Sequence, residues 1–189
     1  MVLKLAISGF GRTGRLAFRS AFERGLEVEF VGVNRGTPQA LAHLLKYDSV
    51  YGKYPGTVEA SGETIIVDGK SIAALELRDP KQLPWKDMGV DIVLESTGVF
   101  REVEKAAWHL EAGASKVIVS APARGECRTV VLGVNDNTYD PANDHIISNA
   151  SCTTNCLAPA AKVVHDSFRI VKGLMTTVHS YTCLLYTSD

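Results

Sequence analysis

A glycine-rich turn near the start of the chain constrains its fold more than any other feature. The pattern G-x-G-x-x-G spans residues 9–14, after the apolar run 3–8 and at the start of a helical pattern over residues 12–24. The first glycine permits a tight turn, the second lets a pyrophosphate approach the backbone, and the third lets helix and strand pack closely. The helix N-terminus supplies free N–H groups and a partial positive charge. The pattern predicts a dinucleotide-binding turn.

Strand-like and helix-like segments alternate beyond this turn. Strands are expected at 28–34, 91–95, 116–120, 129–134 and 145–148, and helices at 39–47 and 101–111. Between them, glycine-containing turns at 61–62 and 68–69 predict edge hairpins within residues 51–90. Strands joined by helical crossovers indicate an α/β fold, a Rossmann-type doubly wound and mainly parallel sheet. We expect residues 1–150 to form this NAD(P)-binding domain.

Composition excludes several other classes of protein. The net charge is -1, and no apolar run approaches the roughly 20 residues of a membrane-spanning helix. Neither nucleic acid nor a membrane is therefore an expected partner. The first residues show no secretory signal, and the four cysteines suit neither a disulfide framework nor a metal site. A cytoplasmic protein without a metal is expected.

The end of the second predicted strand bears on cofactor choice. A carboxylate that binds the adenosine ribose is expected about 20 residues after the glycine turn. Asn34, Arg35 and Gly36 stand there instead. Because an arginine can pair with a 2′-phosphate, Arg35 favours NADP over NAD. The alternative is that Arg35 points to solvent and Asn34 holds the ribose.

The segment SNASCTTNCLAP, residues 148–159, contains the best candidate nucleophile. Cys152 lies where a loop is expected to meet a helix N-terminus, and such a position lowers the pKa of a thiol. His179, at the end of a strand expected over 170–180, could keep Cys152 ionised and move a proton. Cys156, one turn later, is expected in the core. Pro159 is expected to kink the helix or divide it.

Seven segments together resemble one enzyme family. AISGFGRTGR, HLLKYDSVYG, LRDPKQLPW, ESTGVF, VIVSAPA, SNASCTTNCLAP and TTVHSYT occur in order between residue 6 and residue 182. In this order they closely resemble glyceraldehyde-3-phosphate dehydrogenase. The resemblance implies a phosphorylating enzyme of glycolysis and gluconeogenesis that oxidises an aldehyde to an acyl phosphate. It implies the small-molecule substrates glyceraldehyde 3-phosphate and inorganic phosphate, NAD or NADP as cofactor, and a homotetramer.

The same resemblance assigns roles to individual residues. Cys152 would attack the aldehyde with help from His179, and hydride transfer to NAD(P)+ would leave a thioester that phosphate cleaves. The substrate and phosphate positions are Ser151, Thr153 and Thr182. The cofactor positions that the resemblance implies are Arg12, Thr13, Arg78, Ser96, Thr97, Gly98, Phe100 and Ser120. The glycine turn and the end of the second strand add Gly9, Phe10, Gly11, Gly14, Asn34 and Arg35.

Two departures from the family pattern shape the remaining expectations. The family usually has an aspartate in place of Arg35. Residues 183–189, CLLYTSD, do not continue the pattern, and we interpret them as a non-native tail joined to a truncated gene. Residues 151–182 would then begin an α+β catalytic domain that the chain does not finish. We expect residues 1–150 to fold and bind cofactor and the chain itself to be inactive.

Three other functions fit part of the pattern. Erythrose-4-phosphate dehydrogenase shares the nucleophile and the cofactor. Aspartate-semialdehyde dehydrogenase also joins a cysteine to a dinucleotide fold, but HLLKYDSVYG and SCTTNC argue against it. A dinucleotide-binding module without catalysis is the third alternative. In that case Cys152 would have no reason to react faster than Cys127 near neutral pH.

Overall fold

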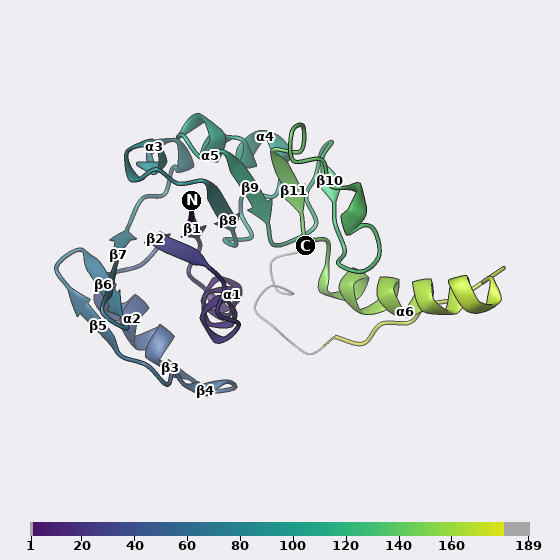
Figure 1. Cartoon of the computed structure of the whole chain (residues 1–189), viewed down its shortest axis with the longest axis horizontal. Coiled ribbons are helices and arrows are strands. Elements are labelled where there is room, and N and C mark those ends of the chain that lie inside the picture. The colour runs from purple at the N-terminus through teal and green to yellow at the C-terminus, as the bar shows by residue number, and fades with distance from the viewer. Residues whose placement is uncertain (1, 180–189) are drawn as a thin grey trace.

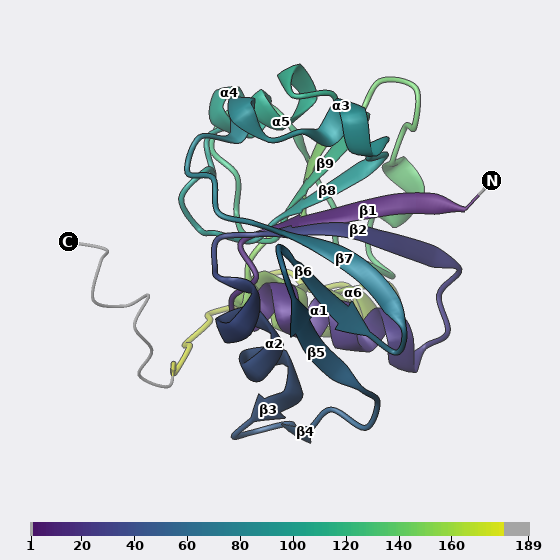
Figure 2. The same ribbon diagram turned by 90° about the vertical axis from the view of Figure 1, so that its left-hand side faces the viewer.

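A nine-stranded sheet with helices on both faces forms the body of the computed structural model, which describes residues 2–179 (Figures 1 and 2). Its strands are β1 (Leu3–Ser8), β2 (Val28–Asn34), β5 (Val58–Ser61), β6 (Thr64–Val67), β7 (Lys70–Leu75), β8 (Ile92–Glu95), β9 (Lys116–Val119), β10 (Arg128–Thr129) and β11 (Ile146–Ser148). A separate hairpin pairs β3 (Tyr47–Asp48) with β4 (Gly52–Lys53). The helices are α1 (Arg12–Glu23), α2 (Pro38–Lys46), α3 (Trp85–Met88), α4 (Val103–Ala106), α5 (Trp108–Glu111) and α6 (Cys152–Phe168).

The strand order places a crevice beside β1. The order is β10-β11-β9-β8-β1-β2-β7-β6-β5, so the chain leaves β1 to one side for β2 and later returns to its other side with β8. The pairs from β10 to β7 are parallel, and β7, β6 and β5 pair antiparallel. In such a sheet ligands bind at the carboxyl ends of the strands where the order reverses. The prediction of a mainly parallel, doubly wound sheet with edge hairpins is confirmed.

The central strand β1 is buried on both sides, as expected for a parallel sheet between helical layers. Ile7 packs in the cluster formed with α1 and α2, which includes Phe18 and Leu45. Ala6, its neighbour, faces the opposite cluster around Trp85 of α3. Figure 2 shows these two helical layers, with α1 and α2 below the sheet and α3, α4 and α5 above it.

Local signals in the sequence set the ends of the first two helices. Gly25 has a φ of 61° directly after the last turn of α1, a backbone conformation that glycine adopts without strain. Thr37 caps α2, since its hydroxyl accepts a hydrogen bond from the N–H of Ala40 at 3.4 Å. Pro38 occupies the first helical position, where a missing N–H costs nothing. Both helices therefore lie within one residue of their predicted bounds.

Four predicted elements differ from the structure. The strand expected at 129–134 is only β10, because a turn begins at Val131: its N–H donates to Asn135 Oδ1 at 2.8 Å, and its carbonyl accepts from Val134. The helix expected at 101–111 is divided into α4 and α5 at Ala107. On either side of this division, the N–H groups of Lys105 and Leu110 donate to carbonyls three residues earlier, which tightens these turns.

The strand expected at 170–180 is also absent from residues 170–179, which have no regular secondary structure. No described strand lies beside this segment to pair with it, and a strand exists only through such pairing. In contrast, α6 is one continuous helix through Pro159, where two segments or a kink were expected. Because α6 buries none of its residues, the carbonyl freed by the proline is open to water.

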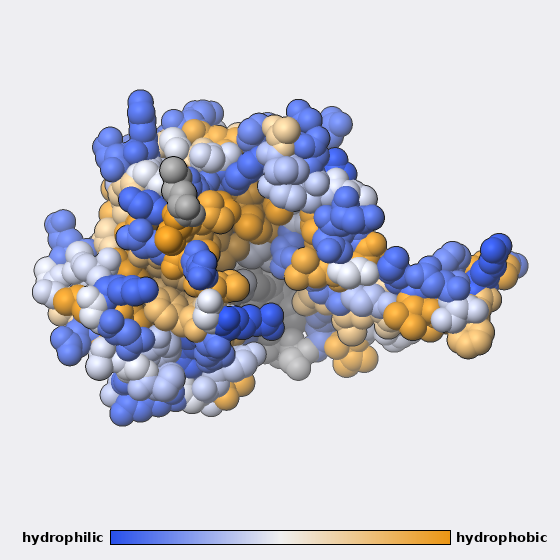
Figure 3. All heavy atoms as spheres, viewed as in Figure 1, coloured by the Kyte–Doolittle hydropathy of each residue, from blue (hydrophilic) through white to orange (hydrophobic). Residues whose placement is uncertain are grey.

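The helix α6 extends away from the sheet, at the right of Figure 1. Its exposed apolar side chains include Leu157, Val163 and Phe168, and Phe168 is 82% exposed. Figure 3 shows hydrophobic residues interspersed with hydrophilic ones on this extension. The sheet and its two layers, not α6, therefore contain the apolar core of the described chain.

Candidate functional site

The glycine turn fills the space between β1, β8 and α1. Gly9 has a φ of 89°, and a Cβ there would lie 2.5 Å from the backbone nitrogen of Thr97. A Cβ on Gly14 would lie 2.5 Å from the carbonyl oxygen of Gly9. A Cβ on Gly11 would meet nothing within 4 Å. Two of the glycines are therefore required for packing, and Gly11 leaves the backbone open to an incoming group.

The N-terminus of α1 is unoccupied by the protein's own groups. Gly11 is the N-cap residue, no side chain caps the helix, and its first turn contains no acidic residue. The free N–H groups of such a turn attract phosphate oxygens. Arg12 and Thr13 lie in this turn and are exposed. The geometry fits the pyrophosphate of a dinucleotide.

A cavity of about 340 Å³ lies beside this turn. Its lining brings together six of the fourteen predicted cofactor residues, Gly9, Phe10, Gly11, Arg35, Ser96 and Thr97, near the ends of β1, β2 and β8. The remaining lining residues are Arg15, Gly36, Ala40, Leu41 and Leu44. Arg15 was missed by the sequence analysis. Its Nη1 donates to the carbonyl of Phe10 at 3.1 Å, and its buried Nε has no partner among the described residues. An unpartnered donor at a cavity wall also suits an anionic ligand.

A second cavity of about 330 Å³ shares Arg35 with the first and adds Glu76, Leu77 and Arg78. Arg35 is exposed, has a φ of 79°, and its guanidinium carbon lies 5.8 Å from the centre of the Phe100 ring. Its N–H donates to the carbonyl of Leu75 at 2.9 Å. Two arginines therefore meet at this second cavity.

Asn34 lines neither cavity. It is buried, its Nδ2 donates to the carbonyl of Leu77 at 2.9 Å, and its Oδ1 accepts from the N–H of Leu77 at 3.0 Å. Its own carbonyl accepts from the N–H of Phe10 at 3.2 Å. The alternative in which the Asn34 amide holds a ribose does not fit, because both ends of the amide are already paired within the protein.

The segment after β8 forms the wall of the first cavity opposite Arg35. The hydroxyl of Ser96 donates to the carbonyl of Gly9 at 2.7 Å, which joins this segment to the glycine turn. Thr97 lines the cavity, Gly98 is exposed, and Phe100 is buried. Ser120 ends up half-buried beyond β9, its N–H donating to the carbonyl of Glu95 at 3.0 Å.

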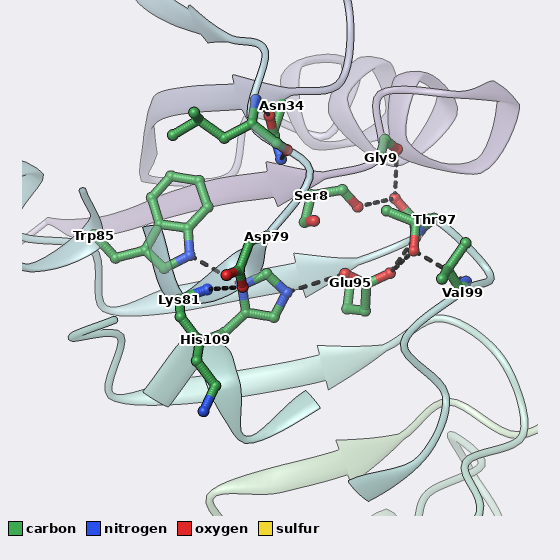
Figure 4. Close-up of polar contacts among 12 residues, drawn as sticks. Ser8, Gly9, Asn34, Asp79, Lys81, Trp85, Glu95, Thr97, Val99 and His109 are labelled. Carbon is green, nitrogen blue, oxygen red and sulfur yellow. Dashed lines mark hydrogen bonds and ion pairs between the residues drawn. The ribbon is translucent and has the colours of Figure 1, made fainter. Parts of the chain in front are cut away.

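A buried polar set beneath this wall was also missed. Glu95, His109 and Trp85 are linked by hydrogen bonds under the segment after β8 (Figure 4). The sequence pattern does not single out His109, and the structure buries it completely. No local motif marks this set, because its members come from α3, β8 and α5.

Cys152 is the first residue of α6 and is exposed. The hydroxyl of Ser151 caps the helix by accepting from the N–H of Thr154 at 2.9 Å. The predicted junction of loop and helix N-terminus is therefore present. Cys156 is exposed as well, contrary to the expected core position, since α6 buries none of its residues. Burial raises the pKa of the third thiol, Cys127.

The chain brings His179 close to the nucleophile segment. His179 Nε2 lies 3.3 Å from Oγ1 of Thr153, the residue after Cys152, and 3.0 Å from Oγ1 of Thr177. Thr182 and residues 183–189 lie outside the described residues. Within residues 2–179 we find no cluster of three potential metal-binding side chains, and none of the helices there could span a membrane.

Comparisons with known proteins agree with this geometry. The profile described as "Glyceraldehyde 3-phosphate dehydrogenase, NAD binding domain" matches residues 3–103, and that of the C-terminal domain of the same family matches residues 151–187. The glyceraldehyde-3-phosphate dehydrogenases of Geobacillus stearothermophilus and Streptomyces coelicolor are 57% and 54% identical over 183 residues. That alignment covers 96% of this chain and 54% of each relative.

A third relative is similar to the same extent. The glyceraldehyde-3-phosphate dehydrogenase of Thermotoga maritima is 56% identical over 181 residues, which are 95% of this chain and 54% of that protein. The chain thus spans about half the length of the curated relatives it matches. A matching profile over more than half of the chain and these identities lead to one conclusion. This chain belongs to the glyceraldehyde 3-phosphate dehydrogenase family.

Proposed function

We propose that the chain carries the dinucleotide site and the nucleophile of a phosphorylating glyceraldehyde-3-phosphate dehydrogenase. The observation that carries the proposal is the position of Cys152: exposed, first in a 17-residue helix, and next to the residue that His179 contacts. The cavity at the glycine turn supports the second half of the proposal. The substrates of the whole protein would be glyceraldehyde 3-phosphate and inorganic phosphate, and its assembly a homotetramer in the cytoplasm.

The chemistry of these residues follows from where they lie. Cys152 lies exposed at the start of α6, where its sulfur can add to an aldehyde carbon. His179 would take the proton of the thiol, pass it to the oxygen of the thiohemiacetal and take it back as hydride leaves the carbon; the Cys152 sulfur then leaves when phosphate cleaves the thioester. A bound nicotinamide supplies the hydride acceptor. Ser151 and Thr153, which flank the thiol, would hold the phosphate that cleaves the thioester.

Arg35 supports the use of NADP in preference to NAD. Arg35 and Arg78 line the second cavity, and Glu76 is its only acidic lining residue among those described. A 2′-phosphate would pair with the planar fork of a guanidinium, whereas the diol of NAD would find no carboxylate at the end of β2. We propose that the adenosine end of NADP occupies this second cavity.

Thiol labelling tests the role of Cys152 with an internal control. Cys156 is exposed on the same helix but lies one turn further in, and Cys127 is half-buried. Because Cys152 is the first residue of α6 and lies next to the residue that His179 contacts, it should react with iodoacetamide about tenfold faster than Cys156 near neutral pH. Peptide mass spectrometry of timed samples gives the three rates. Equal rates for Cys152 and Cys156 would leave a binding module without a nucleophile as the better interpretation.

Fluorescence titration with NADPH and NADH tests the dinucleotide site of the same chain. Saturable binding that Gly11→Val abolishes would support the cavity at the glycine turn, because Gly11 points to open space and its replacement leaves the fold in place. The absence of binding in a folded chain would remove the proposal. Aldehyde-dependent reduction of NAD(P)+ by a full-length version would then test the complete reaction.

A further inference from the structure

A buried hydrogen-bond chain connects α3 and α5 to the wall of the first cavity. The indole Nε1 of Trp85 donates to Nδ1 of His109 at 3.0 Å, and Nε2 of His109 lies 3.0 Å from Oε2 of Glu95. The other carboxylate oxygen of Glu95 accepts from the N–H of Thr97 at 2.8 Å and from the Thr97 hydroxyl. Figure 4 shows these groups in sequence from the indole to Thr97 and on to Val99.

The indole of Trp85, the first group in this series, fixes the direction of the hydrogen bonds from Trp85 to Glu95. An indole N–H only donates, so Nδ1 of His109 must accept and carries no proton. The proton of the neutral imidazole is then on Nε2, where it donates to Glu95. An imidazolium would place two donors face to face at Trp85. The contact between His109 and Glu95 is therefore a directed hydrogen bond from one tautomer, and Glu95 accepts at both of its oxygens.

The far end of the chain lies against the glycine turn. A Cβ on Gly9 would lie only 2.5 Å from the backbone nitrogen of Thr97, so the two segments are in direct contact. Ser96 adds a hydrogen bond to the carbonyl of Gly9 at 2.7 Å. Both Ser96 and Thr97 line the first cavity. A shift of Glu95 would consequently move a wall of the cavity and the turn behind it.

Stability alone does not require such an arrangement. Trp85 and His109 are completely buried, and Glu95 is 2% exposed. Burying a carboxylate is costly, and well-packed apolar residues often stabilise a core equally well. The partners of Glu95 differ from an ordinary core contact in one respect: its second oxygen binds the backbone of the residue that forms the cavity wall.

We propose that Glu95 and His109 are positioning residues for dinucleotide binding. His109, held in one tautomer by Trp85, aims the Glu95 carboxylate at the N–H of Thr97 and so fixes residues 96–99 before the ligand arrives. This inference rests on the proposed dinucleotide site. A wall held in advance loses less conformational freedom on binding, so its loss weakens affinity.

The substitution Glu95→Gln tests the fixed direction of the hydrogen bonds that link Trp85, His109 and Glu95. The amide oxygen of glutamine can accept from Thr97, but its NH₂ group then faces the protonated Nε2 of His109. NADPH and NADH should bind about tenfold more weakly to this variant, measured under conditions where circular dichroism shows a folded chain. The matched control is Val93→Ala, a core truncation on the same strand outside the hydrogen-bond chain. The control should bind as tightly as the unaltered chain even though it unfolds more easily.

A second substitution should partly rescue the first. In Glu95→Gln with Trp85→Phe, the imidazole is free to move its proton to Nδ1 and to accept from the glutamine at Nε2. The double variant should bind more tightly than Glu95→Gln alone, although Trp85→Phe by itself weakens binding, and equal affinities for the single and double variants would contradict the inference. Nitrogen NMR of the His109 ring should show the proton on Nε2 in the unaltered chain and on Nδ1 in the double variant.

The outcomes separate this inference from the proposed function. A folded, unaltered chain that binds neither NADPH nor NADH removes the dinucleotide site and this inference with it. Normal binding by the unaltered chain and equal affinities for Glu95→Gln and Val93→Ala remove this inference alone. Where Glu95→Gln does not fold, the pair His109→Gln and His109→Leu decides. Glutamine keeps one acceptor and one donor and should bind more tightly than leucine, and equal affinities would contradict the inference.

Discussion

The side chain of Asn34 pairs with the backbone of Leu77 as a neighbouring strand would. Its Nδ2 donates to the carbonyl at 2.9 Å, and its Oδ1 accepts from the N–H at 3.0 Å. Backbone pairing between β2 and β7 ends at Asn34 and Leu75, so the amide continues the ladder beyond its last backbone step. This pair fixes the segment that lines the second cavity together with Arg35.

Replacing Asn34 should therefore destabilise the fold, and the loss should be larger the worse the new side chain pairs with the backbone of Leu77. Asn34→Ala leaves two half-buried backbone groups of Leu77 without partners and should lower the free energy of unfolding by about 1–3 kcal/mol. Asn34→Asp should lower it further near neutral pH, because a second carboxylate oxygen would face the carbonyl of Leu77. Urea unfolding followed by circular dichroism measures both. An aspartate variant as stable as the unaltered chain would contradict this geometry.

Arg35→Asp should reverse the cofactor preference. The loss of a charge-assisted hydrogen bond to a 2′-phosphate should weaken NADPH binding about tenfold or more, and a carboxylate there should strengthen NADH binding. Lys53→Asp, the same charge change on the exposed strand β4, serves as the control and should leave both affinities unchanged. A parallel loss of both affinities in Arg35→Asp would indicate a damaged cavity and not a specificity residue.

Gly9 and Gly11 should respond differently to the same substitution. Gly9→Ala adds a Cβ that collides with the backbone of Thr97 at a residue with a φ of 89°, so the chain should lose about 2 kcal/mol or more of stability. Gly11→Ala meets nothing within 4 Å and should fold normally, but its methyl group should hinder a pyrophosphate at the start of α1. Thermal unfolding and NADPH titration on both variants provide the comparison. Unimpaired binding by folded Gly11→Ala would place the ligand elsewhere.

Asp144 should contribute to the acid sensitivity of the fold. The N–H of Asp140, followed by the guanidinium of Arg128, holds the pKa of Asp144 below its ordinary value of 3.8. Because the folded-state pKa is the lower one, the contribution to stability is fully present above the ordinary value. It is lost as the pH falls through the lowered pKa of the folded state.

Urea unfolding at a series of pH values tests this contribution. Asp144→Asn should be less stable than the unaltered chain near neutral pH, and the difference should shrink as the pH falls through this window. A difference that is constant with pH would mean that the charge of Asp144 has no role.

The sequence predicted those elements whose signals are local. The ends of β1 and β2 and the cap at Thr37 follow from apolar runs and from residues adjacent in the chain. The cavity residues Gly9 and Arg35 were found because the order of strands and helices places their loops at one edge of the sheet. The roles of Cys152 and His179 stay predictions, and the labelling experiment tests that of Cys152.

The features that were missed depend on distant partners. His109 has the sequence surroundings of a surface helix, and only the packing of α5 over β8 buries it against Glu95. The sequence left a ribose as a possible ligand of Asn34 because the hydrogen-bond partner of its amide, Leu77, lies 43 residues away in the chain. Apolar composition alone suggested a strand at residues 170–180, but no described strand is positioned to pair with residues 170–179.

The neighbouring positions of β1 and β8 have a consequence for the order of folding. The hydrogen bond from Ser96 to Gly9 spans 87 residues, and β2, β5, β6 and β7 are all formed from the chain in between. Closing so long a loop costs entropy that is offset only once the contact is complete, so we expect the crevice to be assembled late. During synthesis, the glycine turn is made before the segment after β8, which forms the opposite wall of the first cavity. Retention on an immobilised dinucleotide would consequently select chains in which the sheet has closed.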